Sequence, residues 1–594
     1  MKTIILLLAG FLCLIQTAGA QNHPANDLVF STADTSDGYL RPRRMIQTSD
    51  GGFLVAGKFF DQGYITKIQS CGTQVWMRTY AFGDETELLS LVELPSGEIA
   101  AVGSCDNCAP NDSTLKALVI KTDQNGLLLA DTTLGNLNLS ALATDILLNE
   151  DQQLAVTGYL TIGPGFLPSN AFMAIMAPES LQTPDWNTYH QLFYDYSNAI
   201  TQTQEGNYVL AGRSSPALFS PVQAQVYCTD AAGNLLWSHA SPYQNSQFND
   251  VTQAADGRIV ALGDRLVDAN VGRELFMLVL EKETGAVLQE ITLGSEDDDA
   301  GKSIQSVENG FLIGAIYGMP RQQDWNRRDW VLRLDTQFNM VDQYFRDDYL
   351  LAHSMVNALP LSPDGRWFVY YAQVSFFTAN QILFYKHTDQ GYRTLLENAP
   401  SNHQLTPRNL QTNKGDIRIK GAVAPDQYDA LRLDIFRNHQ LFQTFLDDTP
   451  QNFDFQQQME AELAEYTYRL TGVKGSINTL ELEACDLVAG DVYLIQGQSN
   501  AVAGLPLQDA DHAYRHHTSP YIRNFGLKFK NDTLFTWKKE ETGWLDFNDN
   551  IVGQWGILMA KNIVDQHQIP VAVINGAVSG IAIDSLSPPN SRYQ

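Results

Sequence analysis

The chain has 594 residues, 44% of them hydrophobic, and its 39 Lys and Arg against 67 Asp and Glu give a net charge of −28. This length predicts two to four domains, and the hydrophobic content excludes a chain that is disordered throughout. The acidic charge argues against nucleic acid and anionic membrane surfaces as partners.

The first twenty residues, 1–20, have the pattern of a secretory signal peptide. Lys2 supplies the positive charge, the stretch from Ile4 to Ile15 is mainly apolar, and Ala18-Gly19-Ala20 is a small-x-small cleavage site. The apolar run is shorter than the roughly 20 residues that a membrane-spanning helix needs. We therefore expect a secreted or cell-surface protein with no membrane span, whose mature chain begins near Gln21.

A repeat of about 45–55 residues fills the region 21–400, within the range of propeller blades. Each unit has a polar turn followed by a short apolar strand, as in Asp50-Gly51-Gly52-Phe53-Leu54. Equivalent turns contain Ser96, Asp151, Glu205, Asp256, Glu308 and Asp364. A second glycine turn follows in several units, as in Gly233-Asn234-Leu235. Four short strands per unit predict a β-propeller of about seven blades.

These units resemble the Asp-Gly-Gly-Phe/Tyr repeats of secreted bacterial β-propeller proteins, especially those of Bacteroidetes-type organisms. The resemblance covers roughly residues 30 to 400. The acidic residues of the repeat are explained by turn geometry, so we expect this region to be a rigid binding or spacer module.

Five cysteines remain after the signal peptide: Cys71, Cys105, Cys108, Cys228 and Cys485. Five are too few for a disulfide framework in a chain of this size. The run Cys105-Asp106-Asn107-Cys108 favours a local disulfide in an oxidising compartment, with free thiols as the alternative. A zinc site would need a second ligand pair, which the neighbouring sequence does not offer.

The region 401–487 alternates apolar and polar residues over short runs, as in Ile417-Arg418-Ile419 and Leu431-Arg432-Leu433. A period of two predicts half-buried strands, and the size of the region predicts an immunoglobulin-like β-sandwich. The segment from Phe455 to Glu465 is rich in Gln, Glu and Ala and predicts a helical turn.

The region 488–594 changes to a pattern of strand, loop and helix. An apolar strand ends at Ile495, directly before Gly497-Gln498-Ser499-Asn500. Residues 553–564 have the apolar spacing of a helix, and residues 570–575 read as a buried parallel strand. This order predicts an α/β sheet, whose ligands gather at the carboxyl ends of the strands. A serine in a tight turn at such an end is a common way to expose a nucleophile.

Three blocks in this region resemble the sialate O-acetylesterase family of SGNH-type hydrolases, which are carbohydrate esterases. They are Gly497-Gln498-Ser499-Asn500, Gly553-x-x-Gly556 at the start of the helix, and Ser579-Gly580-Ile581-Ala582-Ile583. The third block departs from the family pattern, since Ser579 stands for a glycine and Ile581 for a threonine.

The resemblance implies that Ser499 is the nucleophile of a serine esterase. It implies that the backbone N–H groups of Ser499 and Gly553 stabilise the oxyanion, and that Gln498, Asn500 and Gly580 belong to the oxyanion or substrate site. It implies an acetylated carbohydrate or glycan as substrate, with no metal or organic cofactor.

The family's later Gly-Glu-Ser-Asn and Asp-x-x-His blocks do not follow in this sequence. We therefore expect the chain to cover only the first half of the family domain, with the catalytic Asp and His beyond Gln594. The histidines of Asp511-His512 and His516-His517, together with His567, are the alternative bases.

Two other interpretations stay open. In the first, the chain is a non-catalytic, secreted propeller adhesin or glycan-binding protein with a degenerate hydrolase domain. In the second, the hydrolase acts on another class of ester, such as a lipid or plant-wall ester, because loops set the substrate pocket.

Overall fold

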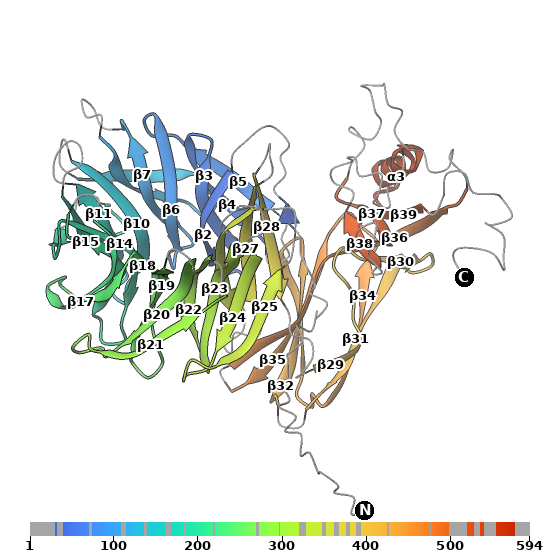
Figure 1. Ribbon diagram of the computed structural model, residues 1–594. Coiled ribbons are helices and arrows are strands. Elements are labelled where there is room, and N and C mark those ends of the chain that lie inside the picture. Colours follow the sequence, from blue (N-terminus) through green and yellow to red (C-terminus); the bar gives the residue numbers. More distant parts are fainter. Residues whose placement is uncertain are drawn as a thin grey trace, which may run out of the picture. The chain divides into compact units, whose positions relative to one another are not determined.

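The chain forms two compact units, Met1–Asp389 and Gln390–Gln594, called the first and the second unit below (Figure 1). Within them, the computed structural model describes residues 30–31, 40–69, 74–108, 114–135, 139–161, 168–181, 186–217, 220–268, 272–295, 298–319, 328–346, 352–360, 368–375, 380–387, 394–424, 427–475, 477–497, 519–527, 535–539 and 554–575.

The first unit consists of antiparallel strands that form propeller-like blades (Figure 1). The strands of the first three sheets are β2 (Leu40–Gln47), β3 (Phe53–Phe59), β4 (Gln62–Ile68) and β5 (Gln74–Tyr80), then β6 (Glu85–Glu93), β7 (Ile99–Asp106), β8 (Lys116–Thr122) and β9 (Leu128–Leu134), and then β10 (Ser140–Leu148), β11 (Leu154–Thr161), β12 (Ser169–Met176) and β13 (Trp186–Tyr189). One parallel pair, Ser169 with Tyr194, joins this third group to the next in a single sheet.

The remaining strands of the first unit follow the same order. They are β14 (Tyr194–Gln202), β15 (Tyr208–Ser215), β16 (Gln223–Thr229) and β17 (Leu235–Gln244), then β18 (Ser246–Gln253), β19 (Ile259–Asp268), β20 (Gly272–Leu280) and β21 (Val287–Leu293), then β22 (Asp298–Val307), β23 (Gly310–Met319), β24 (Arg328–Leu334) and β25 (Met340–Arg346), and last β26 (Ala352–Pro360), β27 (Phe368–Ser375) and β28 (Asn380–His387) with β1 (Phe30–Ser31).

The second and third strands of a blade are buried on both faces, because each sheet packs between two others. Nearly every residue of β3, β4, β7 and β8 is buried, whereas the fourth strand β5 is mostly exposed. Leu54 and Ile65 of one sheet, for example, share a core with Leu88 and Leu118 of the next. This double burial explains why the repeat shows continuous apolar runs in place of an alternation.

The first strands of the sheets form a closed ring. In chain order β2, β6, β10, β14, β18, β22 and β26 each contact the next, and β26 contacts β2. Hydrogen bonds also link the first and the last parts of the unit, because β1 pairs with β28. In this pair Phe30 lies opposite Phe384, which is far away in the sequence. The amino-terminal strand therefore completes the last blade as its fourth strand.

The ring strands β2, β6, β10, β14, β18 and β22 carry a β-bulge at the same place, opposite the second strand of the blade. In β10 the pairing shifts between Ala143 and Asp145, opposite Gly158. Glycines in the same register are Gly57, Gly103, Gly212 and Gly263, whereas Ala315 takes this place in β23. A Cβ atom on Gly158 would lie 1.9 Å from the carbonyl oxygen of Leu142. The glycine of the repeat is thus required by the close approach of the bulged strand.

We expect Gly158→Ala to destabilise the first unit by about 1–3 kcal/mol, the usual cost of overpacking a filled interior. The clash is with backbone, which cannot rotate away, so the bulge itself has to shift. Thermal unfolding followed by circular dichroism measures this change. An unchanged midpoint would show that the bulge does not need the glycine.

In the described residues, the second unit joins a curled, mainly antiparallel sheet to a smaller sheet with one helix (Figure 1). Its elements are β29 (Thr394–Asn398), β30 (Leu405–Asn409), β31 (Lys414–Val423), β32 (Ala430–Arg437), β33 (Gln440–Asp447), β34 (Asn452–Glu460), β35 (Tyr466–Lys474), β36 (Ile477–Ile495), β37 (Ile522–Leu527), β38 (Phe535–Lys539), α3 (Gln554–His567) and β39 (Val571–Asn575). The curled sheet encloses a core that includes Ile417, Leu433 and Tyr468.

The predicted helical turn between Phe455 and Glu465 is wrong. Residues Asn452–Glu460 form strand β34, which pairs with β31 along its length. Phe453, Phe455 and Met459 are buried in the core, while Asp454, Gln456 and Gln458 between them are exposed. The apolar side chains, at a spacing of two and four, decide the conformation over the helix propensity of their neighbours.

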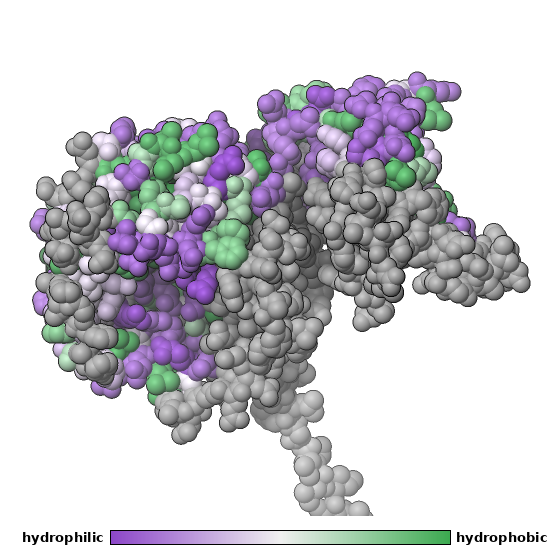
Figure 2. Space-filling model, turned by 90° about the horizontal axis from the view of Figure 1, so that it is seen from above, coloured by the Kyte–Doolittle hydropathy of each residue, from purple (hydrophilic) through white to green (hydrophobic). Residues whose placement is uncertain are grey.

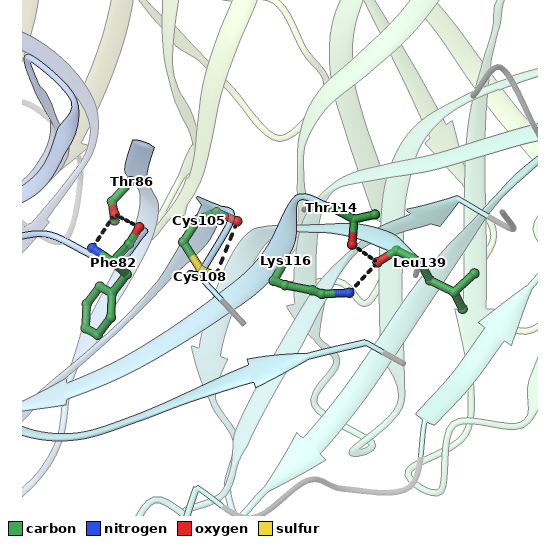
Figure 3. The surroundings of a disulfide bond; sticks show 7 residues. All are labelled: Phe82, Thr86, Cys105, Cys108, Thr114, Lys116 and Leu139. Carbon is green, nitrogen blue, oxygen red and sulfur yellow. Dashed lines mark hydrogen bonds between the residues drawn. A yellow bond between two sulfur atoms is a disulfide. The ribbon is translucent and has the colours of Figure 1, made fainter. Parts of the chain in front are cut away.

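The predicted local disulfide is confirmed, since Cys105 and Cys108 are bonded at the end of β7 (Figure 3). The bond holds the turn that follows β7, whose Asp106 carbonyl accepts a hydrogen bond from Asp84 N at 2.9 Å. Cys228 is a buried free thiol. In the described part of the chain, no helix combines the length and the apolar character that crossing a membrane requires.

Candidate active site

A single strand, β36, carries the chain from the curled sheet into the sheet that holds the candidate site. Its first part pairs with β35, and its last five residues, Asp491–Ile495, pair in parallel with β39. At Gly490 the strand passes so close to β39 that a Cβ atom would lie 1.9 Å from the Pro570 carbonyl oxygen. The motif that begins at Gly497 therefore starts where a strand of a parallel sheet ends.

The parallel pairing brings the ends of two strands together. Ile495, the last residue of β36, is paired with Asn575, the last residue of β39. Strand β37 also pairs in parallel with β39, through Ile522 and Val571. The segments that follow Ile495 and Asn575 consequently leave the sheet at the same edge, where ligands of α/β sheets bind.

Helix α3 leads into β39, and its apolar face covers the sheet. Ile557, Ala560 and Val564 are buried against Ile495 and Val573. Only Gln568, Ile569 and Pro570 separate the helix from β39, so the helix runs back along the sheet in the opposite direction. Its first residue, Gln554, is therefore placed near the carboxyl ends of the strands, which is where a helix N-terminus can bind an anion.

The residues that the sequence predicts for the site lie just beyond these ends. Gln498, Ser499, Asn500, Gly553 and Gly580 are all outside the described residues, as are His512, His516 and His517. Their predicted roles stay predictions. Along the chain, Gln498 is three residues after β36, Gly553 is one residue before α3 and Gly580 is five residues after β39.

His567 is the one alternative base within the described residues, and its position argues against that role. It is the exposed last residue of the 14-residue helix α3. At a rise of about 1.5 Å per residue it lies roughly 20 Å along the helix from Gln554. His567 is thus at the end of the helix away from the carboxyl ends of the strands.

A buried group of charges fixes β37 and β38 to the curled sheet. Lys539 Nζ lies 2.9 Å from Asp486 Oδ2 and 2.9 Å from Glu465 Oε1. Arg523, which is fully buried, contacts Glu465 at 3.0 Å and donates to the Asp486 carbonyl oxygen at 2.9 Å. His403 Nδ1 lies 3.5 Å from Asp486 Oδ2. We call these five residues the buried charge cluster.

Within the buried charge cluster, the electrostatics favour the ionised forms of Asp486 and Lys539. Burial alone would raise the pKa of Asp486, but its contact with His403 and the charge of Lys539 outweigh burial and hold that pKa below its ordinary value. Burial alone would lower the pKa of Lys539, yet Asp486 and Glu465 raise it. Sequence patterns gave no signal for this cluster, because its members come from segments up to 136 residues apart in the chain, from His403 to Lys539.

A second ion pair holds β36 at the point where it enters the sheet of the candidate site. Arg408 donates two hydrogen bonds to the Asp491 carboxylate, at 2.7 and 3.0 Å. Bidentate pairs of this kind fix orientation as well as distance. The part of β36 that precedes Gly497 is therefore held at two points, at Asp486 by the buried charge cluster and at Asp491 by Arg408.

No protein-family profile and no curated protein sequence matches the chain. Among solved structures, a carbohydrate acetylesterase from Xanthomonas citri is similar at 18% identity and a TM-score of 0.21, covering 32% of this chain and 42% of that one. The chain thus spans less than half the length of that structure. An ulvan lyase of a polysaccharide lyase family is similar at 10% identity and a TM-score of 0.40, covering 59% of this chain and 94% of that one.

A neuraminidase-like protein of subtype N10 from a bat influenza A virus is similar at 9% identity and a TM-score of 0.32, covering 60% of this chain and 95% of that one. All three TM-scores are below 0.5. The site therefore has to be argued from the residues of this chain.

Proposed function

We propose that this protein is a secreted serine esterase that removes acetyl groups from carbohydrates. The pairing of Ile495 with Asn575 is the observation that carries the proposal. The strands that precede Ser499 and Gly580 end side by side at one edge of the sheet, and α3 begins directly after Gly553. This arrangement supports a shared site for the three blocks, which are far apart in the sequence.

In the proposed reaction, Ser499 Oγ attacks the acetyl carbonyl carbon, and a general base takes the proton of the hydroxyl group. The backbone N–H groups of Ser499 and Gly553 stabilise the oxyanion, and one such donor typically contributes about 2.7–4 kcal/mol. The C–O bond to the sugar breaks, and the sugar oxygen receives the proton. Water then hydrolyses the acetyl-enzyme by the same steps and releases acetate.

We propose that the first unit is a seven-bladed propeller that binds a glycan. In this proposal the joined sheet of β10 to β17 forms two blades, one that begins with the bulged ring strand β10 and one that begins with the bulged ring strand β14. Closure of the last blade by β1 supports this count. The same unit supports the second candidate function, non-catalytic glycan binding, because it contains a polar cavity at its centre.

The experiment that tests the proposed function is the release of acetate from acetylated xylan and from O-acetylated monosaccharides by the complete gene product. Butyrate and longer acyl esters of the same sugars are the matched controls. We expect acetyl esters to be preferred. Equal hydrolysis of long acyl esters would favour a lipid esterase, and glycan binding without any hydrolysis would favour the non-catalytic function.

A further inference from the structure

The ring of first strands encloses a polar cavity in the first unit. Its volume is about 250 Å³, somewhat below the roughly 300–1,000 Å³ of drug-sized ligand sites, so a small ligand fits. In Figure 2 hydrophilic residues gather around a hollow in the exposed face of this unit. The lining residues that matter here are Arg43, Arg44, Asn198, Asn249, Lys302 and Asn357.

The bulges of the ring strands place these side chains, and hydrogen bonds between blades hold several of them. Asn198 Nδ2 donates to the Phe248 carbonyl oxygen at 2.7 Å, and Asn249 Nδ2 donates to the Gly301 carbonyl oxygen at 2.8 Å. In both residues the nitrogen of the side-chain amide is used by the fold. The carbonyl oxygen of each amide is the acceptor left for a ligand, on a wall whose geometry is fixed.

Arginine 44 brings positive charge into the middle of the ring. It lies on β2, and its Nη1 atom is 3.9 Å from Oδ2 of Asp250, which lies on β18. These two strands are not neighbours in the ring, so the guanidinium reaches across the interior. Arg43, which also lines the cavity, donates from Nε to Glu87 Oε1 at 2.5 Å, and Lys302 contributes a third cation.

The acidic groups near the cavity are engaged by the fold itself. Asp145 accepts hydrogen bonds from Ser90 Oγ at 2.6 Å and from Ile200 N at 3.1 Å. Asp250 accepts from Val251 N and from Ile304 N, both at 2.9 Å. These carboxylates join neighbouring blades through backbone N–H groups. Of the charged residues that line the cavity itself, three are cations and one, Asp145, is acidic, within a protein of net charge −28.

A buried acceptor in the cavity has no hydrogen-bond partner in the described part of the chain. Asn357 is 6% exposed and lines the cavity, and its Oδ1 atom is unsatisfied. Leaving a buried polar atom without a hydrogen bond lowers the stability of the folded state by about 1–3 kcal/mol, so folded proteins rarely contain such atoms. A hydroxyl group of a ligand would supply the missing hydrogen bond.

We propose that this cavity binds a small polyhydroxylated carboxylate, a sugar acid of the hexuronate type. Arg44 and Lys302 bind the carboxylate, and the amide oxygens of Asn198, Asn249 and Asn357 accept hydrogen bonds from the hydroxyl groups. The site belongs to the first unit and does not depend on the proposed esterase activity.

The test is isothermal titration calorimetry on the full chain with galacturonate, galactose and acetate. We expect galacturonate to bind at least tenfold more tightly than either of the other two, because a hydrogen-bonded charge contributes about one factor of ten or more. Galactose binding as tightly as galacturonate would overturn the role of the cations. Acetate binding as tightly would overturn the role of the hydroxyl groups, and no binding of any of the three would overturn the site.

Two cavity variants and one control variant make the test specific. Lys302→Met should weaken galacturonate binding at least tenfold, whereas Lys561→Met, on the exposed face of α3, should leave it unchanged. Asn357→Leu should weaken binding about fivefold while leaving the thermal midpoint equal or higher, since it removes an unsatisfied buried atom. Unchanged binding in both cavity variants would overturn the proposal even if calorimetry detects the ligand.

The pH dependence gives a further readout. Burial raises the pKa of Asp250 to about 6, although the nearby charge of Arg44 opposes this and Asp145 adds to it. Protonation of Asp250 below this pH removes a negative charge beside Arg44. Galacturonate affinity should therefore rise as the pH falls from 7 to 5, and an affinity that falls over this range would contradict the proposed placement of the carboxylate.

Discussion

Replacing Ser499 with alanine should lower acetate release by the complete gene product roughly 10⁴–10⁶-fold, the range for loss of an activated serine nucleophile. The effect is this large because the acetyl-enzyme of the proposed reaction forms on the Ser499 hydroxyl group. The proposed oxyanion donors are backbone N–H groups, which the substitution does not remove. The measurement is steady-state hydrolysis of an acetylated sugar, with acetate quantified directly.

Ser401→Ala is the matched control, since Ser401 is exposed, lies in the same unit and only caps a local turn. It should leave both hydrolysis and the thermal midpoint unchanged. Ser499→Ala should also leave the midpoint unchanged. Hydrolysis that survives in Ser499→Ala would remove this serine from the mechanism.

Asp486→Asn should lower the free energy of unfolding of the second unit by about 3–5 kcal/mol, the typical cost of removing one partner of a buried ion pair. Asp486 is fully buried, and its replacement removes a carboxylate that contacts the ammonium group of Lys539, which is also buried. Asparagine isolates the effect of charge, because Asp486 has a φ of 57° and Asn tolerates this left-handed conformation. Urea denaturation followed by fluorescence measures the change.

Asp454→Asn is the control for the second prediction. Asp454 pairs with Arg418 in the same unit, at 2.6 and 2.7 Å, but the pair is exposed to solvent. Exposed pairs of this kind contribute little to stability, so the control should unfold almost like the parent protein. Equal effects of the two substitutions would show that burial does not decide the strength of the buried charge cluster.

The same cluster predicts a dependence of stability on pH. The pKa of Asp486 is lowered in the folded protein, so its stabilising contribution is complete above the ordinary pKa of Asp, about 3.9. That contribution is lost as the pH falls further, toward the folded pKa. The difference in unfolding free energy between the parent and Asp486→Asn should therefore shrink below about pH 4; a difference that grows in acid would contradict this assignment.

The blades could be predicted from the sequence because their turns are coded locally. Gly97 and Gly257 lie in predicted turns and adopt φ angles of 82° and 89°, which favour glycine. The apolar strands next to these turns are buried on both faces, as continuous apolar runs predict. The bulges of the ring strands could not be predicted, because they depend on the register between two strands.

The start of the candidate site could also be predicted, since an apolar strand before Gly497 and a helix before β39 are both local patterns. What could not be predicted is the single strand β36, which crosses the expected boundary between residues 487 and 488 without a break. Its sequence contains Cys485, Asp486, Gly490 and Asp491, which look like the residues of a connecting loop. Contacts with other strands keep it extended: Gly490 allows the close approach of β39, and Asp486 and Asp491 are paired with cations.

Covalent labelling tests most directly whether Ser499, in the motif that follows β36, is the reactive group. The complete gene product is treated with a fluorophosphonate, which reacts with activated serines, and its peptides are mapped by mass spectrometry. We expect the label on Ser499 and its absence from Ser499→Ala. A label on a different serine, or no label on a protein that releases acetate, would contradict the account.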